Sequence, residues 1–344
     1  MPTVSETAGY RLLREVEEAV HREVVGQDRT IQGLLIALIT GGHILLEGLP
    51  GLAKTLLVRT LANALDTSFR RIQFTPDLLP GDIVGTPVYH QGTGEFKVYK
   101  GPIFANMVLA DEVNRAPPKV QSALLEAMEE EQVTIDGITH ALPSPFMVLA
   151  TQNPIEQQGT YPLAEAQLDR FMMKLRIGYP DRAEEKEIIR RVALRPAPLE
   201  DLPTRPVPND ASADSSEDRS DGTGAAAGAI LAARRELDRV GVADEIQDYV
   251  VALVFATREP ATAGLADFET LLEFGISPRA TIFLTRAARA HAYLQGRDFV
   301  LPDDVKAMAA PVFRHRMRTT YEADARGIDA DELIARLLRT VPSP

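Results

Sequence analysis

One stretch near the N-terminus, residues 43–55, constrains the fold of this chain more than any other. It opens with the apolar run Ile44-Leu45-Leu46, which predicts a buried strand, and passes through a turn rich in glycine and proline to Lys54-Thr55. Apolar residues then recur at helical spacing over residues 57–65. The sequence therefore predicts a strand, a tight loop and a helix in direct succession.

The residue types in this loop suit the binding of phosphate groups. Gly48 and Gly51 let the backbone turn tightly and point its N–H groups inward, and the helix that starts near Lys54 adds the positive end of its dipole. We expect the Lys54 ammonium to reach the β- and γ-phosphates of a nucleotide, and the Thr55 hydroxyl to ligate Mg²⁺. The predicted loop consists of Gly48, Leu49, Pro50, Gly51, Leu52, Ala53, Lys54 and Thr55.

Ala53 departs from the general pattern G-x-x-x-x-G-K-[ST], because it stands where the second glycine is expected. A methyl group is tolerated there if the residue has a negative φ. On this stretch alone, a glycine-rich turn before an ordinary helix stays open as an alternative.

Two carboxylates follow another apolar strand, predicted over residues 106–110. They are Asp111 and Glu112, and a helix with prolines at its start comes next. Open α/β sheets bind ligands at the C-terminal ends of their strands, so these side chains should lie beside the phosphate loop. There Asp111 would help to hold Mg²⁺ through water, and Glu112 would orient and deprotonate the attacking water. An isolated Asp-Glu pair is more commonly solvated, and it is the combination with the loop that favours the catalytic interpretation.

An asparagine and two arginines complete the candidate catalytic residues. Asn153 follows a buried strand at 146–150, so it should reach the same edge and bond the attacking water or the γ-phosphate. Arg170 follows a short helix and is placed to be offered to a neighbouring subunit, while Arg279 begins a helix of the C-terminal region. Each arginine taken alone is more commonly half of a surface ion pair.

The order of the predicted elements indicates an α/β domain followed by a smaller helical domain. Five strands alternating with helices predict a doubly wound, mainly parallel sheet within residues 1–195. Residues 196–228, rich in Pro, Ala, Ser, Asp and Gly, predict a disordered acidic linker or insertion. Residues 229–344 predict an all-helical domain, with helices at 230–240, 243–257, 278–294, 302–313 and 329–338.

Smaller features of the first domain give further expectations. Ser5 is a candidate cap for a first helix that ends near Glu23. Residues 75–101 form an irregular excursion with β-like pieces at Ile83-Val84 and 96–99, for which a functional role and a solvated surface loop both stay open. Residues 131–142 predict a β-hairpin around Asp136-Gly137.

Composition excludes several classes of function. The chain carries 37 basic and 49 acidic residues, a net charge of −12, which counts against nucleic acid or an anionic membrane as the main partner. It has no cysteine, which removes disulfides, thiolate metal sites and cysteine nucleophiles, and its six histidines never approach zinc-ligand spacing. We see no signal peptide and no apolar run of the roughly 20 residues that span a bilayer, so we expect a cytoplasmic protein without membrane insertion.

Taken together, these motifs resemble the MoxR family of AAA+ ATPases. The resemblance rests on residues 48–55, 109–116, 150–154, 165–171 and 277–280, and it covers nearly the whole chain except 196–228. It implies that Val25, Gly26 and Gln27 line the adenine pocket, that Lys54 and Thr55 are the Walker A pair, and that Asp111 and Glu112 are the Walker B pair. It also implies that Asn153 is sensor 1, Arg170 the arginine finger acting on the next subunit's ATP, and Arg279 sensor 2, with Arg115 as another residue that faces the neighbour.

The resemblance further implies how such a protein works. ATP and Mg²⁺ would be its cofactors, and it would assemble as a homo-oligomeric ring, typically a hexamer. Residues 75–101 would be the clade's insertion in helix 2, and the 131–142 hairpin would precede sensor 1; both face the central pore or the client in related rings. The family's usual role is to mature or activate client proteins, often with a partner that carries a von Willebrand factor A domain.

Three classes of function remain open from the sequence. The first is an ATP-hydrolysing remodeller of protein complexes. The second is a DNA-directed AAA+ motor, against which the acidic balance counts. The third is a nucleotide-gated scaffold in which ATP binding rather than hydrolysis matters.

Overall fold

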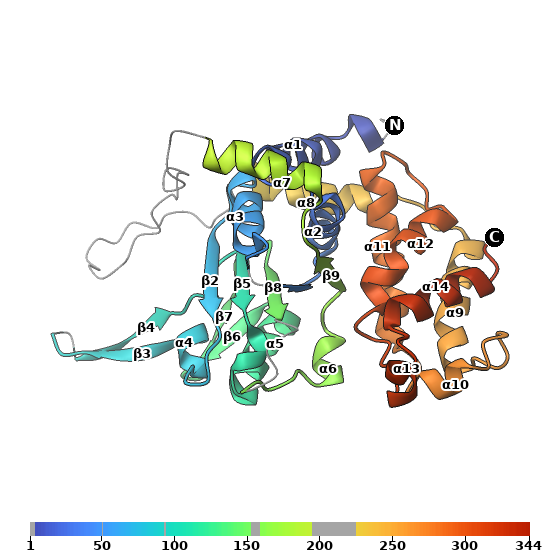
Figure 1. The fold of residues 1–344 in the computed structure, drawn as a ribbon. Coiled ribbons are helices and arrows are strands. Elements are labelled where there is room, and N and C mark those ends of the chain that lie inside the picture. The colour runs from blue at the N-terminus through green and yellow to red at the C-terminus, as the bar shows by residue number, and fades with distance from the viewer. Residues whose placement is uncertain (1–3, 50, 93, 153–158, 195–224) are drawn as a thin grey trace.

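A five-stranded parallel sheet forms the centre of the computed structural model, which describes residues 4–49, 51–92, 94–152, 159–194 and 225–344 (Figure 1). Its strand order is β2-β5-β8-β1-β9, and all neighbouring strands are parallel. The strands are β1 (Ile44–Gly48), β2 (Phe69–Gln73), β5 (Met107–Asp111), β8 (Met147–Gln152) and β9 (Met173–Ile177). The predicted five-stranded parallel sheet is confirmed.

Helices cover both faces of this sheet, because alternate residues of each strand point into two separate cores. Leu46 and Leu109 enter the core that also holds buried residues of α1, α2 and α3, whereas Leu45 and Val108 enter the core that holds those of α5. The helices of this domain are η1 (Val4–Glu6), α1 (Ala8–Glu23), α2 (Asp28–Thr40), α3 (Lys54–Ala64), α4 (Pro80–Val84), η2 (Val113–Arg115), α5 (Pro118–Glu130), α6 (Glu165–Leu168), α7 (Arg182–Ile188) and the π-helical turn η3 (Ile189–Ala193).

The C-terminal part of the described chain is helical, as predicted. Its helices are α8 (Ala225–Leu237), α9 (Asp244–Arg258), α10 (Phe268–Leu271), α11 (Pro278–Leu294), α12 (Pro302–Phe313), α13 (Tyr321–Ala325) and α14 (Ala330–Thr340). Helix α8 packs on the first domain: Glu236 accepts a hydrogen bond from the Gly9 N–H at 3.3 Å, and Arg234 donates to the Leu38 carbonyl at 3.0 Å. In the part of the chain that the structure describes, no helix is both long and apolar enough to cross a membrane.

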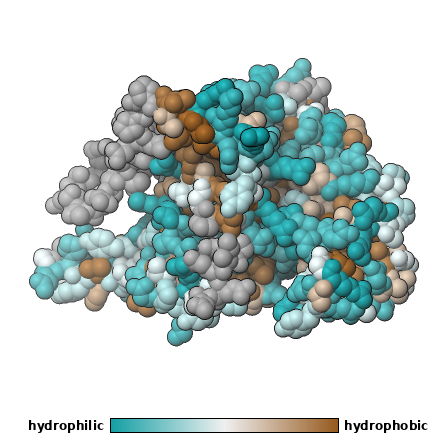
Figure 2. Space-filling model, in the orientation of Figure 1, coloured by the Kyte–Doolittle hydropathy of each residue, from teal (hydrophilic) through white to brown (hydrophobic). Residues whose placement is uncertain are grey.

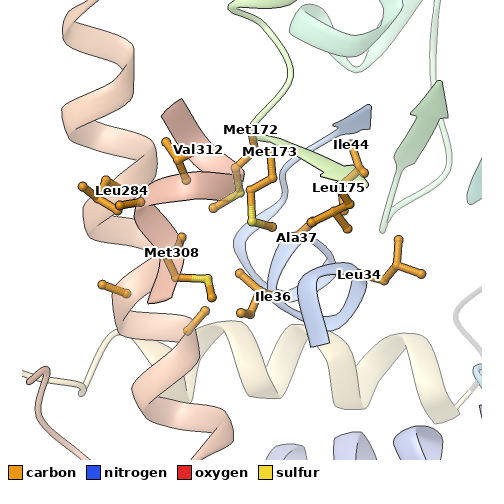
Figure 3. Packing of buried hydrophobic residues seen from close by; sticks show 14 of the residues in the cluster. Leu34, Ile36, Ala37, Ile44, Met172, Met173, Leu175, Leu284, Met308 and Val312 are labelled. Carbon is orange, nitrogen blue, oxygen red and sulfur yellow. The ribbon is translucent and has the colours of Figure 1, made fainter. Parts of the chain in front are cut away.

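The helical domain, here called the lid, shares one hydrophobic core with the sheet domain. Figure 3 shows side chains of α2 and β9, such as Ile36 and Met173, facing Leu284 of α11 and Met308 of α12. Leu175 of β9 lies close above Gly33 of α2, where a Cβ would come within 2.8 Å of it. The lid is therefore packed against the strand that follows Arg170.

A buried carboxylate links two helices within the lid. Asp304, on α12, is 1% exposed and pairs with His291 of α11 and Arg297, each at 2.6 Å. These contacts, and a bond from the Leu301 N–H, hold its pKa at about 2, below the ordinary value of 3.8, although burial acts in the opposite direction.

Some local expectations were wrong. The first helix begins at Ala8 with Thr7 as its N-cap, because Ser5 lies in the 3₁₀ turn η1. Ile83-Val84 ends helix α4 and is not β-like. Pro80 starts that helix, and the Asp82 carboxylate accepts from the Leu79 N–H at 2.8 Å, which caps it.

Short elements beyond the main strands were harder to foresee. The strand β3 (Gly85–His90) pairs with β4 (Glu95–Lys100), so the 75–101 excursion contains a regular hairpin. The helices α10 and α13 had no predicted counterpart, and α8 begins inside the segment predicted as linker, whose residues 196–224 lie outside the described chain. The predicted hairpin around Asp136-Gly137 is confirmed as β6 (Gln132–Ile135) and β7 (Ile138–Ala141).

Several surface regions expose apolar side chains, among them the β3–β4 hairpin and η3. The β3–β4 hairpin projects from the body of the molecule (Figure 1), and Tyr89 and Phe96 on it are 52% and 67% exposed. Figure 2 shows an apolar patch at η3, where Ile189 and Val192 are exposed. The rest of the face in Figure 2 is largely hydrophilic.

Candidate nucleotide-binding site

The predicted phosphate loop connects β1 to α3, and only Pro50 within it lies outside the described residues. Gly48 is the last residue of β1, and a Cβ there would lie 2.8 Å from the Ile177 carbonyl oxygen of β9. Glycine is thus required at this position by the close approach of β9. Gly51, by contrast, has a φ of +85°, which meets the predicted need for a tight turn.

Ala53 does not have the negative φ that a methyl group prefers. Its φ is 54° and its ψ is 22°, which is the left-handed conformation, and it is the N-cap of α3. An L-residue in this conformation costs about 1–2 kcal/mol. The loop therefore has, at this position, a backbone conformation that favours glycine although an alanine occupies it.

Lys54 and Thr55 are the first residues of α3. The half-buried Lys54 ammonium donates to the carbonyl of Gly48 at 2.7 Å. Burial lowers its pKa below the ordinary value of 10.5, while the carboxylates of Asp111 and Glu112 act in the opposite direction. The lysine of the loop and the two acids at the end of β5 thus influence one another electrostatically, as expected for one shared site.

Asp111 is held by two neighbours that position its carboxylate. Thr151 donates to its Oδ1 at 2.5 Å, and Arg71 donates to its Oδ2 from Nη2 at 2.6 Å and from Nε at 3.0 Å. Thr151, the residue after Ala150 on β8, is 1% exposed. One carboxylate oxygen thus faces a buried hydroxyl and the other a cation.

Glu112 has a strained backbone at the point where the chain leaves β5. Its φ is 57° and its ψ is 49°, a conformation that costs a non-glycine residue about 1–3 kcal/mol and concentrates at functional sites. The Thr151 hydroxyl accepts from its N–H at 2.8 Å. Its Oε2 accepts from Gln73 Nε2 at 2.7 Å and lies 3.2 Å from Arg115 Nε. Arg115, the other candidate for a neighbour's site, therefore contacts Glu112 of its own chain.

Sequence reasoning missed Arg71, Gln73 and Thr151. Arg71 and Gln73 are alternate residues of β2, so they share one face, and Gln73 is the register partner of Asp111. This alternation of polar residues could have indicated a polar face of β2 beside Asp111. Thr151 gave none, because a single threonine after an apolar run usually continues the strand.

The turn predicted to line the adenine pocket lies at the same end of the sheet. Gln27, with a φ of 63°, donates from Nε2 to the carbonyl of Gly178 at 3.3 Å, and Gly178 directly follows β9. The half-buried Val25 and Gly26 precede it, and a Cβ on Gly26 would meet the flexible Glu184 side chain. Since Gly48 packs on the last residue of β9, this turn and the phosphate loop both adjoin the end of one strand. Asn153 lies outside the described residues.

Arg170 and Arg279 lie together, but away from this loop. Both pair with Glu129 near the end of α5: Arg170 Nη2 is 3.0 Å from Glu129 Oε2, and Arg279 Nη2 is 2.6 Å from Oε1. The two arginines and Glu129 line one cavity of about 200 Å³ with His43. We call Arg170 and Arg279 the arginine pair.

The arginine pair lies near the N-terminal ends of the strands, whereas Lys54 lies near their C-terminal ends. His43 directly precedes β1, whereas Lys54 follows it, and His43 Nε2 donates to the carbonyl of Met128, the neighbour of Glu129, at 2.9 Å. A five-residue strand is about 16 Å long. The pair therefore cannot serve the phosphate loop of its own chain.

The residues at the Lys54 edge fit a nucleotide with Mg²⁺. The first turn of α3 has backbone N–H groups without partners inside the helix, and these can donate to phosphate oxygens. A Cβ built on Gly51 meets no atom within 4 Å, so the loop surface is open there. Thr55 and Asp111 supply a hydroxyl and a carboxylate, which are the oxygen ligands that Mg²⁺ prefers.

The chain is similar to known proteins over most of its length. The family model described as "ATPase family associated with various cellular activities (AAA)" matches residues 43–173, and an AAA lid domain model matches residues 266–337. Chaperone MoxR1 of Mycobacterium tuberculosis is 46% identical over 325 residues, which are 94% of this chain and 80% of that protein. Protein MoxR of Methylorubrum extorquens is 32% identical, covering 98% of this chain and 95% of that protein. A crystal structure of a candidate ATPase from Cytophaga hutchinsonii has a TM-score of 0.83 and 46% identity, covering 97% of this chain and 95% of that one.

Proposed function

The chain belongs to the MoxR family of AAA+ ATPases, and from this we propose that it hydrolyses ATP to drive chaperone-like remodelling, maturation or activation of other protein complexes. The observation that carries the proposal is the meeting of two strand ends: the loop after β1 brings Lys54 and Thr55 to the edge where β5 delivers Asp111 and Glu112.

Each residue at this edge has a separate task in the proposed reaction. The loop N–H groups and Lys54 bind the phosphates, which requires Lys54 to leave the Gly48 carbonyl that it contacts here. Mg²⁺, when bound through Thr55 and Asp111, would neutralise charge on the phosphates. Glu112 accepts a proton from the attacking water, and Thr151 holds the strained backbone that aims it.

The position of the arginine pair supports assembly into a ring. If Arg170 or Arg279 is to add positive charge to that of Lys54 on the phosphates, it must act on the nucleotide of another subunit, because both arginines lie at the opposite ends of the strands of their own sheet. We assign Arg170, and Arg279 beside it, to the nucleotide of the neighbouring subunit. A closed ring, which we take to be a hexamer, gives every site one such neighbour.

The β3–β4 hairpin is the surface that we assign to client contact. It projects from the body, and the rings of Tyr89 and Phe96 lie 5.2 Å apart on its exposed face. Exposed aromatic groups on a projecting element are typical of protein-binding surfaces. The family resemblance extends this to a partner with a von Willebrand factor A domain.

Two substitutions test the proposed hydrolysis. Lys54→Ala should abolish ATP binding and phosphate release, since it removes the cation that binds the phosphates. Glu112→Gln should bind ATP as the wild type does but release phosphate about 10²- to 10⁴-fold more slowly, because it removes the general base. Titration calorimetry and a phosphate-release assay measure the two quantities separately, with the exposed Glu18→Gln as the matched control.

The outcomes also separate the alternatives. A wild-type rate in Glu112→Gln would overturn the assignment of the base. Complementation of a deletion by that variant in cells would favour a scaffold gated by ATP binding. Strong stimulation of phosphate release by DNA at physiological salt would favour a DNA-directed motor.

A further inference from the structure

A buried arginine of the lid is bonded to the backbone on both sides of Arg170. Arg316, in the turn after α12, has a side chain that is 2% exposed. Its Nη2 donates to the carbonyl of Asp169 at 2.8 Å and to that of Phe171 at 2.7 Å, and its Nη1 donates to the carbonyl of Met172 at 3.2 Å. The lid thereby fixes the segment that carries Arg170.

The same guanidinium is connected to Arg279 through a shared carboxylate. Arg316 Nε donates to Asp169 Oδ1 at 2.7 Å, and the Ser277 hydroxyl donates to the same carboxylate at 2.8 Å. Ser277 is the N-cap of α11, and Arg279 is the second residue of that helix. Asp169 therefore connects the segment of Arg170 to the start of the helix that carries Arg279.

We propose that Arg316 is the positioning residue of the arginine pair, presenting Arg170 and Arg279 together to the neighbouring subunit's nucleotide. This inference rests on the proposed function, because it requires that the pair act between subunits. In this proposal, the lid sets the positions of the Arg170 and Arg279 guanidinium groups that act on the neighbouring subunit. Arg316 itself, buried beneath them, touches no nucleotide.

The chemistry of Arg316 suits this task and excludes a simple replacement. A planar guanidinium offers five donors in a fixed arrangement, whereas a lysine ammonium in its place is a point charge with three. Burial lowers the pKa of Arg316 to about 10, against the effect of Asp169, so it stays charged at neutral pH. Its guanidinium carbon also lies 5.1 Å from the ring centre of Phe283 on α11.

The first test uses the nucleotide-free protein. Arg316→Lys should accelerate amide hydrogen exchange at residues 170–172 by at least about tenfold, since the carbonyls that anchor this segment lose their donors. Arg314→Lys is the matched control: Arg314 also joins the lid to the sheet, by donating to the Lys174 carbonyl at 2.8 Å, but it does not contact the segment of Arg170. Exchange that is equally fast in both variants, or unchanged in Arg316→Lys, would overturn the proposal.

The second test measures turnover. Arg316→Lys should lower phosphate release by about 100-fold, the cost of a displacement of about 1 Å in a catalytic group, while ATP affinity stays at the wild-type value. In rings mixed with Glu112→Gln subunits, which keep an intact arginine pair but lack the base, Arg316→Lys subunits should regain turnover. Mixing with Arg170→Ala subunits should restore none.

The mixed rings distinguish a failure of the proposed ring mechanism from a failure of the role assigned to Arg316. If Arg170→Ala and Glu112→Gln subunits do not rescue each other, the arginine pair does not act between subunits and the proposed ring mechanism fails. If they do rescue each other while Arg316→Lys alone keeps the wild-type rate, only the role of Arg316 fails. Should Arg316→Lys not fold, Ser277→Ala removes a single donor to Asp169 and should show the same pattern at smaller amplitude.

Discussion

Replacing Thr151 with valine tests whether one buried hydroxyl positions both acids of the site. The change keeps the shape of the side chain and removes its only polar group. Asp111 then loses a charge-assisted hydrogen bond, worth about 1.5–3 kcal/mol, and the Glu112 N–H is left without a partner, which costs about 1–3 kcal/mol. We expect the free energy of unfolding to fall by about 3 kcal/mol, near the low end of this sum, because valine gains some apolar contact.

Turnover in Thr151→Val should fall by more than the loss of folded protein explains. The left-handed backbone of Glu112 is held by the bond to Thr151, and its release should displace the carboxylate and slow phosphate release by about 100-fold. Urea unfolding and phosphate release per folded molecule measure the two effects.

Two variants serve as controls for this prediction. Thr151→Ser keeps the hydroxyl and should keep most of the activity. Asn106→Ala removes buried hydrogen bonds to Ser68 and Pro145 at the other end of β5, so it should lose stability without losing turnover per folded molecule. Equal turnover in Thr151→Val and the wild type would refute the role assigned to Thr151.

Two further predictions concern stability at positions where the structure allows a magnitude. The lowered pKa of Asp304, about 2 against 3.8, stabilises the lid fully above pH 4, and about 2 kcal/mol should be lost as the pH falls from 4 to 2. Asp304→Asn should remove this part of the acid dependence, as measured by unfolding at each pH. Gly48→Ala should lower the melting temperature and weaken ATP binding, because its Cβ would lie 2.8 Å from the Ile177 carbonyl oxygen and displace the phosphate loop. Gly92→Ala, where a Cβ meets no atom within 4 Å, is the control, and an equal loss in both would contradict this reading.

The parts of the fold that sequence could predict are those set by local patterns. The apolar runs before Gly48 and Asp111 specify buried strands, and parallel strands must bring their C-terminal ends to one edge, so the meeting of Lys54 with two acids followed from order alone. The hairpin at Asp136-Gly137 followed from turn chemistry, since both residues adopt the positive φ that such a turn requires.

Other features depend on contacts that no local pattern encodes. Ala53 adopts a positive φ because the loop geometry overrides the preference of a methyl group, which sequence alone weighs the other way. Thr151 reaches the candidate site only because β8 lies beside β5. The pairing of Arg170 and Arg279 with Glu129 could not be predicted from sequence either, because Glu129 and Arg279 are 150 residues apart.

The length of α5 supports the proposed action of the arginine pair between subunits. The helix begins shortly after Glu112 and ends at Glu130, next to the residue that pairs with both arginines, so its 13 residues span about 20 Å from one edge of the sheet to the other. No side chain bridges that length. Asp111 and Glu112 thus lie shortly before one end of this helix, and Glu129, which pairs with both arginines, lies near its other end. In the proposed ring, a neighbouring subunit would present its arginine pair to this chain's Asp111 and Glu112, and α5 of that neighbour would lead to the next site in turn.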